Sequence, residues 1–420
     1  MSRGVGRGLL LAVAATLVWL GFGLANGPAQ GNDTRSYARV ADALAEGRIV
    51  TSIRSPGYPL FVVATRRLAR LLDTEPAHTL LVVQTALLAG VGTALVCALG
   101  ERLAGGRTAG IAAAVLYAGD ADLQQFASTA LPEALAVLLA IVGGWLRVRD
   151  GGWRRAAWPI ALLAIVHPRF LGLPLAFAAV AGWRRPAAAV GILGPSAVLL
   201  GTWAALSLAS GADPLRPQRY FLPLDAFGKI YEAGLWQRLP DGPERRLIAT
   251  ARARGDDPYQ AAAALRARGG DATVLRVARS AARADPLGYA RAVAAIPRHA
   301  FKQGTFMRPE LMQPEHPSPG WLAATGAWRR AYRRIFYASF PLFVVLLGLA
   351  CWNGLGWPAA VAPLRAFVGP FVVGLLATVA LGSLSTYDVG RLALPVHPFY
   401  CLEWGLVAGW VAARLRGHAR

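Results

Sequence analysis

Long apolar runs recur along the chain, and they limit its possible folds more than any other feature. The runs over residues 78–103 and 187–209 exceed the roughly 20 helical residues that cross the hydrocarbon core of a bilayer. Backbone polar groups in that core must be paired within the protein, which a helix achieves inside one segment. Only 16% of the residues are charged, against roughly 25% in soluble domains. We therefore predict an all-α, polytopic integral membrane protein.

The segments that join these runs alternate in charge, which gives each predicted span a direction. Basic joins stay in the cytoplasm under the positive-inside rule, so residues 101–107 and 147–155 are placed inside and the acidic join 119–122 outside. Much of the net charge of +21 comes from the arginines of such basic joins, so it does not indicate a nucleic-acid partner. Windows of roughly 20 residues predict about nine to eleven transmembrane helices. The predicted spans cover residues 9–25, 78–103, 108–117, 132–146, 158–166, 170–182, 187–209, 335–351, 361–380 and 392–413.

Two details of this topology stay open. The first run, 9–25, has the length of a signal peptide, but a chain with many later spans needs no cleaved signal, so a retained span is favoured. The runs 158–166 and 170–182, separated by His167-Pro168-Arg169, are short for two full spans, and one tilted span fits them as well. The predicted location is the cytoplasmic (inner) membrane, with multiple passes and the functional site facing outside.

The alternation divides the chain into three parts. Residues 1–210 form an N-terminal transmembrane module, which includes a first outer loop over 27–77. Residues 211–334 are predicted to form an extracytoplasmic, mostly helical section, and 335–420 return as C-terminal transmembrane helices. A polar section of this size beside a membrane is expected to cover or bind something, or to act as a spacer.

The first outer loop has the pattern of a helix lying on the membrane surface. Apolar residues recur at helical spacing from Tyr37 to Leu44, with charged residues mostly on the other face, and Gly47 is expected to end the helix. Pro56-Gly57-Tyr58-Pro59 is predicted to be a rigid turn because proline fixes its own backbone angle. Residues 60–72 carry too many arginines to span and are predicted to be an interfacial helix.

Polar side chains gather at the outer membrane face of this topology. Ionisable groups this close to the bilayer core cost a few kcal/mol and mark function by default. The set mixes acids with arginine and histidine, which suits a reaction in which a carboxylate takes a proton from a hydroxyl while cations hold a phosphate leaving group. The candidate site residues are Asp33, Arg54, Tyr58, Asp120, Asp122, His167, Arg169, Tyr387 and Arg391.

The order of these pieces resembles the type C glycosyltransferases, the GT-C superfamily. An outer-loop acid, an amphipathic helix and a basic residue just ahead of PGYP are similar in layout to the protein O-mannosyltransferase and aminoarabinose-transferase group. The resemblance covers most of the chain in order, although no single motif is specific. Its further pieces are TALPEALAVLLA, IVHPRFLGLPL, DPLGYARAVAAIPRHAFKQGTF and DVGRLALPVHPFY.

The resemblance implies a polyprenyl-phosphate-linked sugar as donor, an inverting transfer outside the membrane, and a hydroxyl acceptor on a lipid, glycan or protein. By position, Asp33 would be the catalytic base, and Asp120 or Asp122 the second-loop acid. The implied phosphate contacts are Arg54, Arg169 and Arg391, with Tyr58, His167 and Tyr387 as supporting donors. The protein O-mannosyltransferases carry an Asp-Glu pair where this chain has Asp33 followed by Thr34, so the chain falls outside that subgroup and its acceptor stays open.

Several of these residues also have an ordinary structural explanation. The negative charge of Asp33 would stabilise the first turn of its helix through the helix dipole. Asn32-Asp33-Thr34 also matches a glycosylation acceptor. Asp120 and Asp122 would solvate a loop, His167 would be a packed histidine, and Arg391 an interfacial anchor. Glu133, after Pro132, is expected to be a helix N-terminal residue rather than a catalytic one.

Two other classes of function compete with the glycosyltransferase. A transporter or flippase of lipid-linked saccharides would need no catalysis, but the chain shows no internal repeat and its ionisable groups collect at one face rather than at the midplane. A non-catalytic scaffold of a cell-envelope complex is the third. Asp120 and Asp122 carry oxygen ligands suited to Ca²⁺ or Mn²⁺, but so few carboxylates together do not predict a metal site, and no cofactor is assigned.

Overall fold

The computed structural model confirms the all-α class. It describes residues 3–31, 33–104, 106–150, 152–182 and 186–302, then 312–314, short pieces between 320 and 383, and 389–418. The described strands are β1 (Ala29–Gly31) and β2 (Met312–Pro314), which pair antiparallel and join the first outer loop to the end of the predicted outer section.

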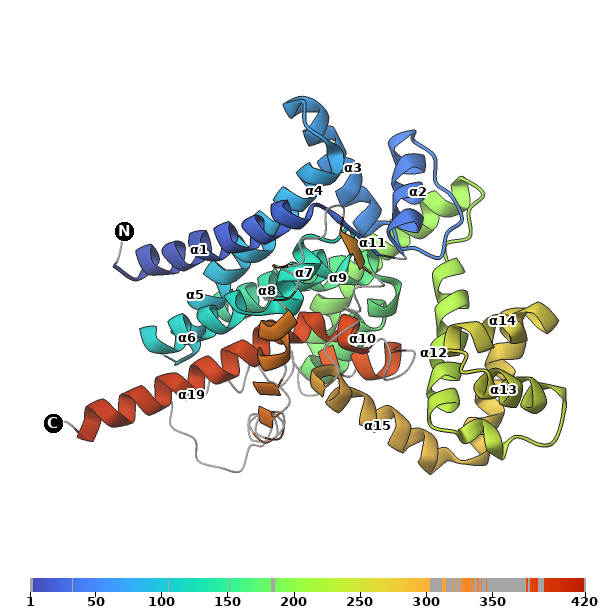
Figure 1. Cartoon of the computed structure of the whole chain (residues 1–420). Helices are drawn as coiled ribbons and strands as arrows, with labels where there is room; N and C mark the ends of the chain where they lie inside the picture. Colours follow the sequence, from blue (N-terminus) through green and yellow to red (C-terminus); the bar gives the residue numbers. More distant parts are fainter. Residues whose placement is uncertain are drawn as a thin grey trace.

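The N-terminal part is a layered set of helices. In Figure 1 the chain's two ends lie at the same end of this set, and the first outer loop lies away from them. Its helices are α1 (Arg3–Asn26), α2 (Thr34–Ala45), α3 (Gly57–Leu72), α4 (Pro76–Thr85), η1 (Ala86–Val91), α5 (Gly92–Ala104), α6 (Arg107–Ala118), α7 (Ala121–Ala127), α8 (Glu133–Asp150), α9 (Ala157–Val166), η2 (Pro168–Phe170), α10 (Leu173–Gly182) and α11 (Pro186–Ala209).

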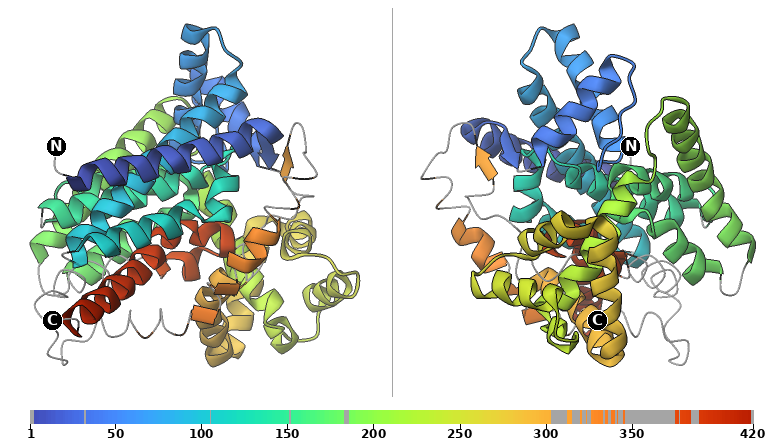
Figure 2. Two further views of the ribbon diagram at one scale, coloured as in Figure 1. Left: turned by 60° about the vertical axis from the view of Figure 1, so that its left-hand side comes forward. Right: turned by 90° about the vertical axis from the view of Figure 1, so that its right-hand side faces the viewer.

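Helices far apart in sequence pack side by side in this part. The last helix, α19 (His397–His418), lies against α6, which in turn packs on α5, and α1 covers α5 and α6 (Figure 2, left). Short segments α18 (Val389–Ala393) and η5 (Leu394–Val396) lead into α19 and reach α8. The N-terminal and C-terminal helices therefore form one body.

Within the described residues, three helical segments are long and apolar enough to cross a membrane. They are Gly8–Asn26, Pro76–Leu103 and Pro186–Ala209. On α11, Val190 and Leu208 are 71% and 67% exposed, which is unfavourable in water and indicates a surface that faces lipid. The chain is therefore a membrane protein with transmembrane helices. Helices α6 and α9 are apolar but shorter, and the predicted spans 335–351 and 361–380 lie largely outside the described residues, so the number of spans stays a prediction.

The predicted outer section contains a second body of helices, at the far end of the molecule from the two chain ends (Figure 1). A separate apolar cluster holds it together, built on Phe227, Tyr231, Leu265 and Val277 among others. Helix α14 of this body has a kink at Gly269-Gly270. Its helices are α12 (Arg216–Glu232), η3 (Leu235–Arg238), α13 (Pro243–Ala253), α14 (Pro258–Ala284) and α15 (Pro286–Lys302).

The first outer loop differs from expectation at one point. Its helix α2 ends as predicted, with Gly47 at φ +74°. The predicted rigid turn at residues 56–59 is wrong, because Pro56 precedes α3 directly and Gly57, Tyr58 and Pro59 form its first turn. Proline is tolerated there since the first N–H groups of a helix have no partner within it.

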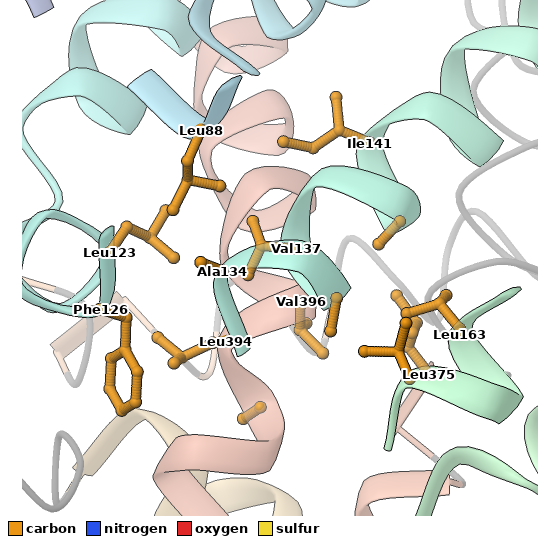
Figure 3. Close-up of a cluster of buried hydrophobic side chains, with 14 of the residues drawn as sticks. Leu88, Leu123, Phe126, Ala134, Val137, Ile141, Leu163, Leu375, Leu394 and Val396 are labelled. Atoms are coloured by element: carbon orange, nitrogen blue, oxygen red, sulfur yellow. The ribbon is translucent and has the colours of Figure 1, made fainter. Parts of the chain in front are cut away.

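A buried apolar cluster sets the register of the central helices. Figure 3 shows Ala134 and Val137 of α8 near Leu394 and Val396 of η5, with Ile141 farther along α8 and residues of η1, α7 and α9 around them. Ala134 directly follows Glu133, and Leu394 lies three residues after Arg391. Packing of these side chains therefore fixes where those two charged residues meet.

The packing of α6 depends on a close approach at Gly110, and we predict the effect of filling it. A Cβ added at Gly110 would lie 2.4 Å from the Cys97 carbonyl oxygen, whereas one at Gly201 on α11 meets nothing within 4 Å. Gly110→Ala should therefore lower the midpoint of thermal unfolding in detergent, since overpacking costs about 1–3 kcal/mol. Gly201→Ala is the matched control and should leave the midpoint unchanged or raise it, because alanine is the better helix former. Equal midpoints for the two variants would contradict this packing.

Candidate functional site

Four charged side chains from distant parts of the chain meet at one point. Asp33, in the first outer loop, contacts Arg54 through one carboxylate oxygen and Arg391 through the other, the latter at 2.8 Å. Arg391 also donates to a carboxylate oxygen of Glu133. Asp33 and Arg391 are 358 positions apart in sequence. We call Asp33, Arg54, Glu133 and Arg391 the charge cluster.

Asp33 occupies the N-cap position of α2, but its side chain does not cap the helix. Its side chain makes no capping hydrogen bond, while its backbone oxygen accepts from the N–H groups of Ser36 and Tyr37. The Thr34 hydroxyl donates to the Ala130 carbonyl oxygen at 3.1 Å, which ties this end of α2 to the segment before α8. The carboxylate is thus directed at the two arginines rather than at its own helix.

Arg54 is fixed by the helix that follows Asp33. Its Nε donates to the Ser36 hydroxyl at 2.7 Å, and its guanidinium lies 4.9 Å from the centre of the Tyr37 ring. A cation over an aromatic face gains about 0.5–2 kcal/mol, more when water is excluded. The guanidinium is therefore held in one place before any ligand arrives.

The cluster is enclosed but open on the side of Asp33. The exposed fraction of the side chain is 26% for Asp33, 17% for Arg391 and 8% for Arg54, and Glu133 is buried. Burial alone would raise the pKa of the Asp33 carboxyl, but attraction to Arg391 and Arg54 outweighs it and holds that pKa well below its usual range. Asp33 is therefore ionised and, in this state, a weak proton acceptor.

Three buried polar atoms of this region have no hydrogen-bond partner among the described residues. They are Nη2 of Arg391, Oε2 of Glu133 and the hydroxyl of Tyr37. Buried polar groups are nearly always paired, because an unpaired one costs about 1–3 kcal/mol. The cluster therefore has unused donors and acceptors that a polar ligand could satisfy.

The second-loop acids do not contact Asp33 in the described part of the chain. Asp120 caps α7, accepting from the N–H groups of Asp122 and Leu123 at 3.0 and 3.1 Å. Its other oxygen lies 2.7 Å from Nδ1 of His397, at the start of α19. Asp122 is buried on α7. Asp120 thus has a structural role as a link between α7 and α19, and the catalytic role predicted for either acid stays a prediction.

The predicted break in the membrane region is present, and its arginine is already paired. Helix α9 ends at Val166, and His167, with an extended backbone, accepts from the Arg169 N–H at 3.3 Å. Arg169 lies 2.7 Å from Asp225 of α12, with both side chains almost fully buried. Its guanidinium also lies over the Phe221 ring at 4.9 Å. Arg169 therefore ties the outer section to the membrane part.

Tyr58 supports the site by packing against Tyr37. It is fully buried, its hydroxyl lies 2.8 Å from Oε1 of Gln84, and its ring stands edge-on to Tyr37 at 5.3 Å. The Gln84 amide in turn donates to the Thr129 carbonyl oxygen at 2.9 Å. Tyr58 thus positions the Tyr37 ring that contacts the Arg54 guanidinium. Tyr387, also predicted here, lies outside the described residues.

Sequence reasoning missed two members of the site. Glu133 was expected to be only a helix N-terminal residue, and Tyr37 only part of the apolar face of α2. The sequence did carry one signal for Glu133, its position relative to the membrane. The predicted topology places the Glu133 carboxylate at the outer end of one span, level with Arg391 at the outer end of another. For Tyr37 no sequence signal existed, because the ring's contact with Arg54 depends on how α2 and the following loop fold together.

No metal centre is found in the described ranges, where His, Cys, Asp and Glu side chains form no group of three or more. Comparison with protein-family models, with curated proteins and with solved structures finds no match for this chain. The function therefore has to be argued from the charge cluster itself.

The Arg169–Asp225 pair leads to a prediction on stability. Arg169→Ala removes one partner of this buried ion pair, and breaking such a pair costs about 3–5 kcal/mol. We expect a clear loss of thermal stability in detergent, and partial recovery in the double variant R169A/D225A, which removes both charges. If D225A lowers the stability of R169A by as much as it lowers the stability of the wild type, the two side chains are not coupled.

Proposed function

We propose that this protein is a membrane glycosyltransferase of the GT-C type, which transfers a sugar from a polyprenyl-phosphate donor to a hydroxyl acceptor. The transfer would occur at the outer face of the cytoplasmic membrane, with inversion at the sugar carbon. The observation that carries the proposal is the charge cluster, in which one partly exposed carboxylate is flanked by two arginines from different segments. The predicted topology of about nine to eleven spans belongs to this proposal.

Arg54 and Arg391 are the donor-binding groups in this proposal. Arginine is suited to phosphate because its planar fork of N–H groups matches two oxygens at once. Nη2 of Arg391 has no hydrogen-bond partner among the described residues, so it is free to meet a phosphate oxygen. Glu133 acts as a positioning residue, since its carboxylate accepts from Nε of the same guanidinium. The polyprenyl tail would lie between spans.

Asp33 is the general base in this proposal. The acceptor hydroxyl oxygen attacks the sugar carbon, and its proton passes to the Asp33 carboxylate. The bond from the same carbon to the phosphate oxygen breaks, and polyprenyl phosphate leaves with the additional negative charge. The two arginines stabilise that charge as it develops, which is the main electrostatic contribution expected of such a site.

Donor binding would also prepare the base. With the site empty, Arg54 and Arg391 hold the pKa of Asp33 low, which makes it a poor proton acceptor. A donor phosphate competes for the same arginines and adds negative charge nearby, and both effects raise the pKa of Asp33. The carboxylate therefore becomes a stronger base only when the donor is in place, which limits unproductive chemistry.

Asp33→Asn tests the base. Asparagine keeps the size and removes the proton acceptor, so we expect turnover to fall by about 10²–10⁴-fold, the usual contribution of a general base. The measurement is release of polyprenyl phosphate by purified protein in detergent, from a panel of polyprenyl-phosphate sugars. Glu46→Gln, at the exposed end of the same helix, is the matched control and should behave as wild type.

The outcomes separate this proposal from its competitors. Wild-type turnover in Asp33→Asn would remove Asp33 as the base. No release by the wild type from any donor in the panel, with the protein folded, would favour a transporter or flippase of lipid-linked saccharides.

The pH dependence of transfer tests the coupling between donor and base. The profile of kcat/KM reports the free enzyme, and that of kcat reports the donor-bound enzyme. Because the donor raises the pKa of Asp33, the acidic limb of kcat should lie at higher pH than that of kcat/KM. Arg54→Gln should move the kcat/KM limb upward, since it removes one of the charges that lower this pKa. Coincident limbs in the wild type would contradict the coupling.

A further inference from the structure

A cavity lies beside the charge cluster, and nothing in the proposed reaction uses it. Its volume is about 350 Å³, and its walls are α2, α3, the start of α4 and the chain around β1. Tyr37 and Tyr58 are lining residues, and the Tyr37 ring also contacts the Arg54 guanidinium. Arg54 and Arg391 are not among the residues that line it. The Tyr37 ring thus lies between this space and the arginines assigned to the donor.

The cavity lies at the level of the membrane surface. Its wall residues Pro76, Leu80 and Leu81 belong to the first turns of Pro76–Leu103, one of the segments able to cross a membrane. Its other long wall, α3, exposes Leu60 and Leu71 on the opposite side. An amphipathic helix with leucines on one face buries that face among lipid chains. Lipid is therefore the nearest source of an occupant.

The lining of the cavity is apolar inside and cationic at its exposed edge. Leu80, Leu81 and Val62 are buried, whereas Arg35 is exposed and makes no ion pair in the described part of the chain. Arg66, also in the lining, is partly exposed and pairs with Asp42 at 2.5 Å. Glu75, the acid of the lining, is engaged by His78 at 2.9 Å.

The surrounding segment adds to this charge. Residues 33–73 hold seven arginines against four carboxylates. Cations beside a membrane attract anionic headgroups by about 1 kcal/mol each, so the field at the cavity edge favours an anionic lipid over a zwitterionic one.

We propose that this cavity binds a membrane phospholipid with an anionic headgroup. One hydrocarbon chain would lie against Val62, Leu80 and Leu81, and the headgroup phosphate would lie between Arg35 and Arg66. A phospholipid fits better than the polyprenyl-phosphate donor because the arginines assigned to the donor lie behind Tyr37 and outside the lining. The inference concerns binding alone and stands or falls separately from glycosyl transfer.

The test compares two tryptophan substitutions on one helix. Ala38 lines the cavity, and Ala45, at the end of α2, is exposed and does not. Purified protein in detergent is titrated with dioleoylphosphatidylglycerol, and bound lipid is counted by native mass spectrometry. We expect the wild type and Ala45→Trp to retain one tightly bound lipid that Ala38→Trp loses. Equal lipid retention by both variants would overturn the proposal.

A second variant tests the headgroup without filling the cavity. Arg35→Gln should reduce the preference for phosphatidylglycerol over phosphatidylcholine about fivefold, the equivalent of roughly 1 kcal/mol. An unchanged preference would place the headgroup elsewhere. A parallel titration with undecaprenyl phosphate distinguishes the two lipid sources. If undecaprenyl phosphate displaces the phospholipid from the wild type but binds Ala38→Trp poorly, the cavity belongs to the donor and the proposal is wrong.

Discussion

The contact of Arg391 with both Asp33 and Glu133 is the interaction on which the rest of the site depends. It joins the first outer loop, the start of α8 and the segment before α19, three parts of the chain that lie far apart in sequence. A buried guanidinium is tolerable only if its charge is balanced nearby. The apolar cluster of α8, α9 and η5 makes that balance geometrically possible, because it fixes the register of the helices that carry Glu133 and Arg391 (Figure 3).

Around this centre, the other buried polar contacts act as joints between layers. Asp120 with His397 links α7 to α19, and Arg169 with Asp225 links the break after α9 to the outer section. Both pairs are almost fully enclosed, so their role is to hold neighbouring elements in place. Asp33 differs from them in being partly exposed, which is why it, rather than the other acids, is assigned a role in chemistry.

The cavity beside the cluster extends this organisation to the membrane surface. Helix α2 begins directly after Asp33, and its first residues form a wall of the cavity. A lipid bound there would stabilise the loop that positions Asp33 and Arg54. The basic character of this loop is thus compatible with two separate anion-binding places, one between the arginines of the cluster and one at the cavity edge.

The sequence by itself determined the class of protein, the C-terminal end of α2 and the break at His167, which follow from local rules: apolar length, helical periodicity and glycine or proline at helix ends. It also named Asp33, Arg54 and Arg391 as candidates, because the predicted topology places all three at one membrane face. Only the tertiary structure decided which charges meet. Glu133 joined the cluster, while Asp120 and Arg169 found buried partners in His397 and Asp225, because ion pairing depends on how helices that are distant in sequence pack together. The first turn of α3 was mispredicted for a related reason, since proline is equally acceptable in a turn and at a helix start, and the neighbouring packing selects between them.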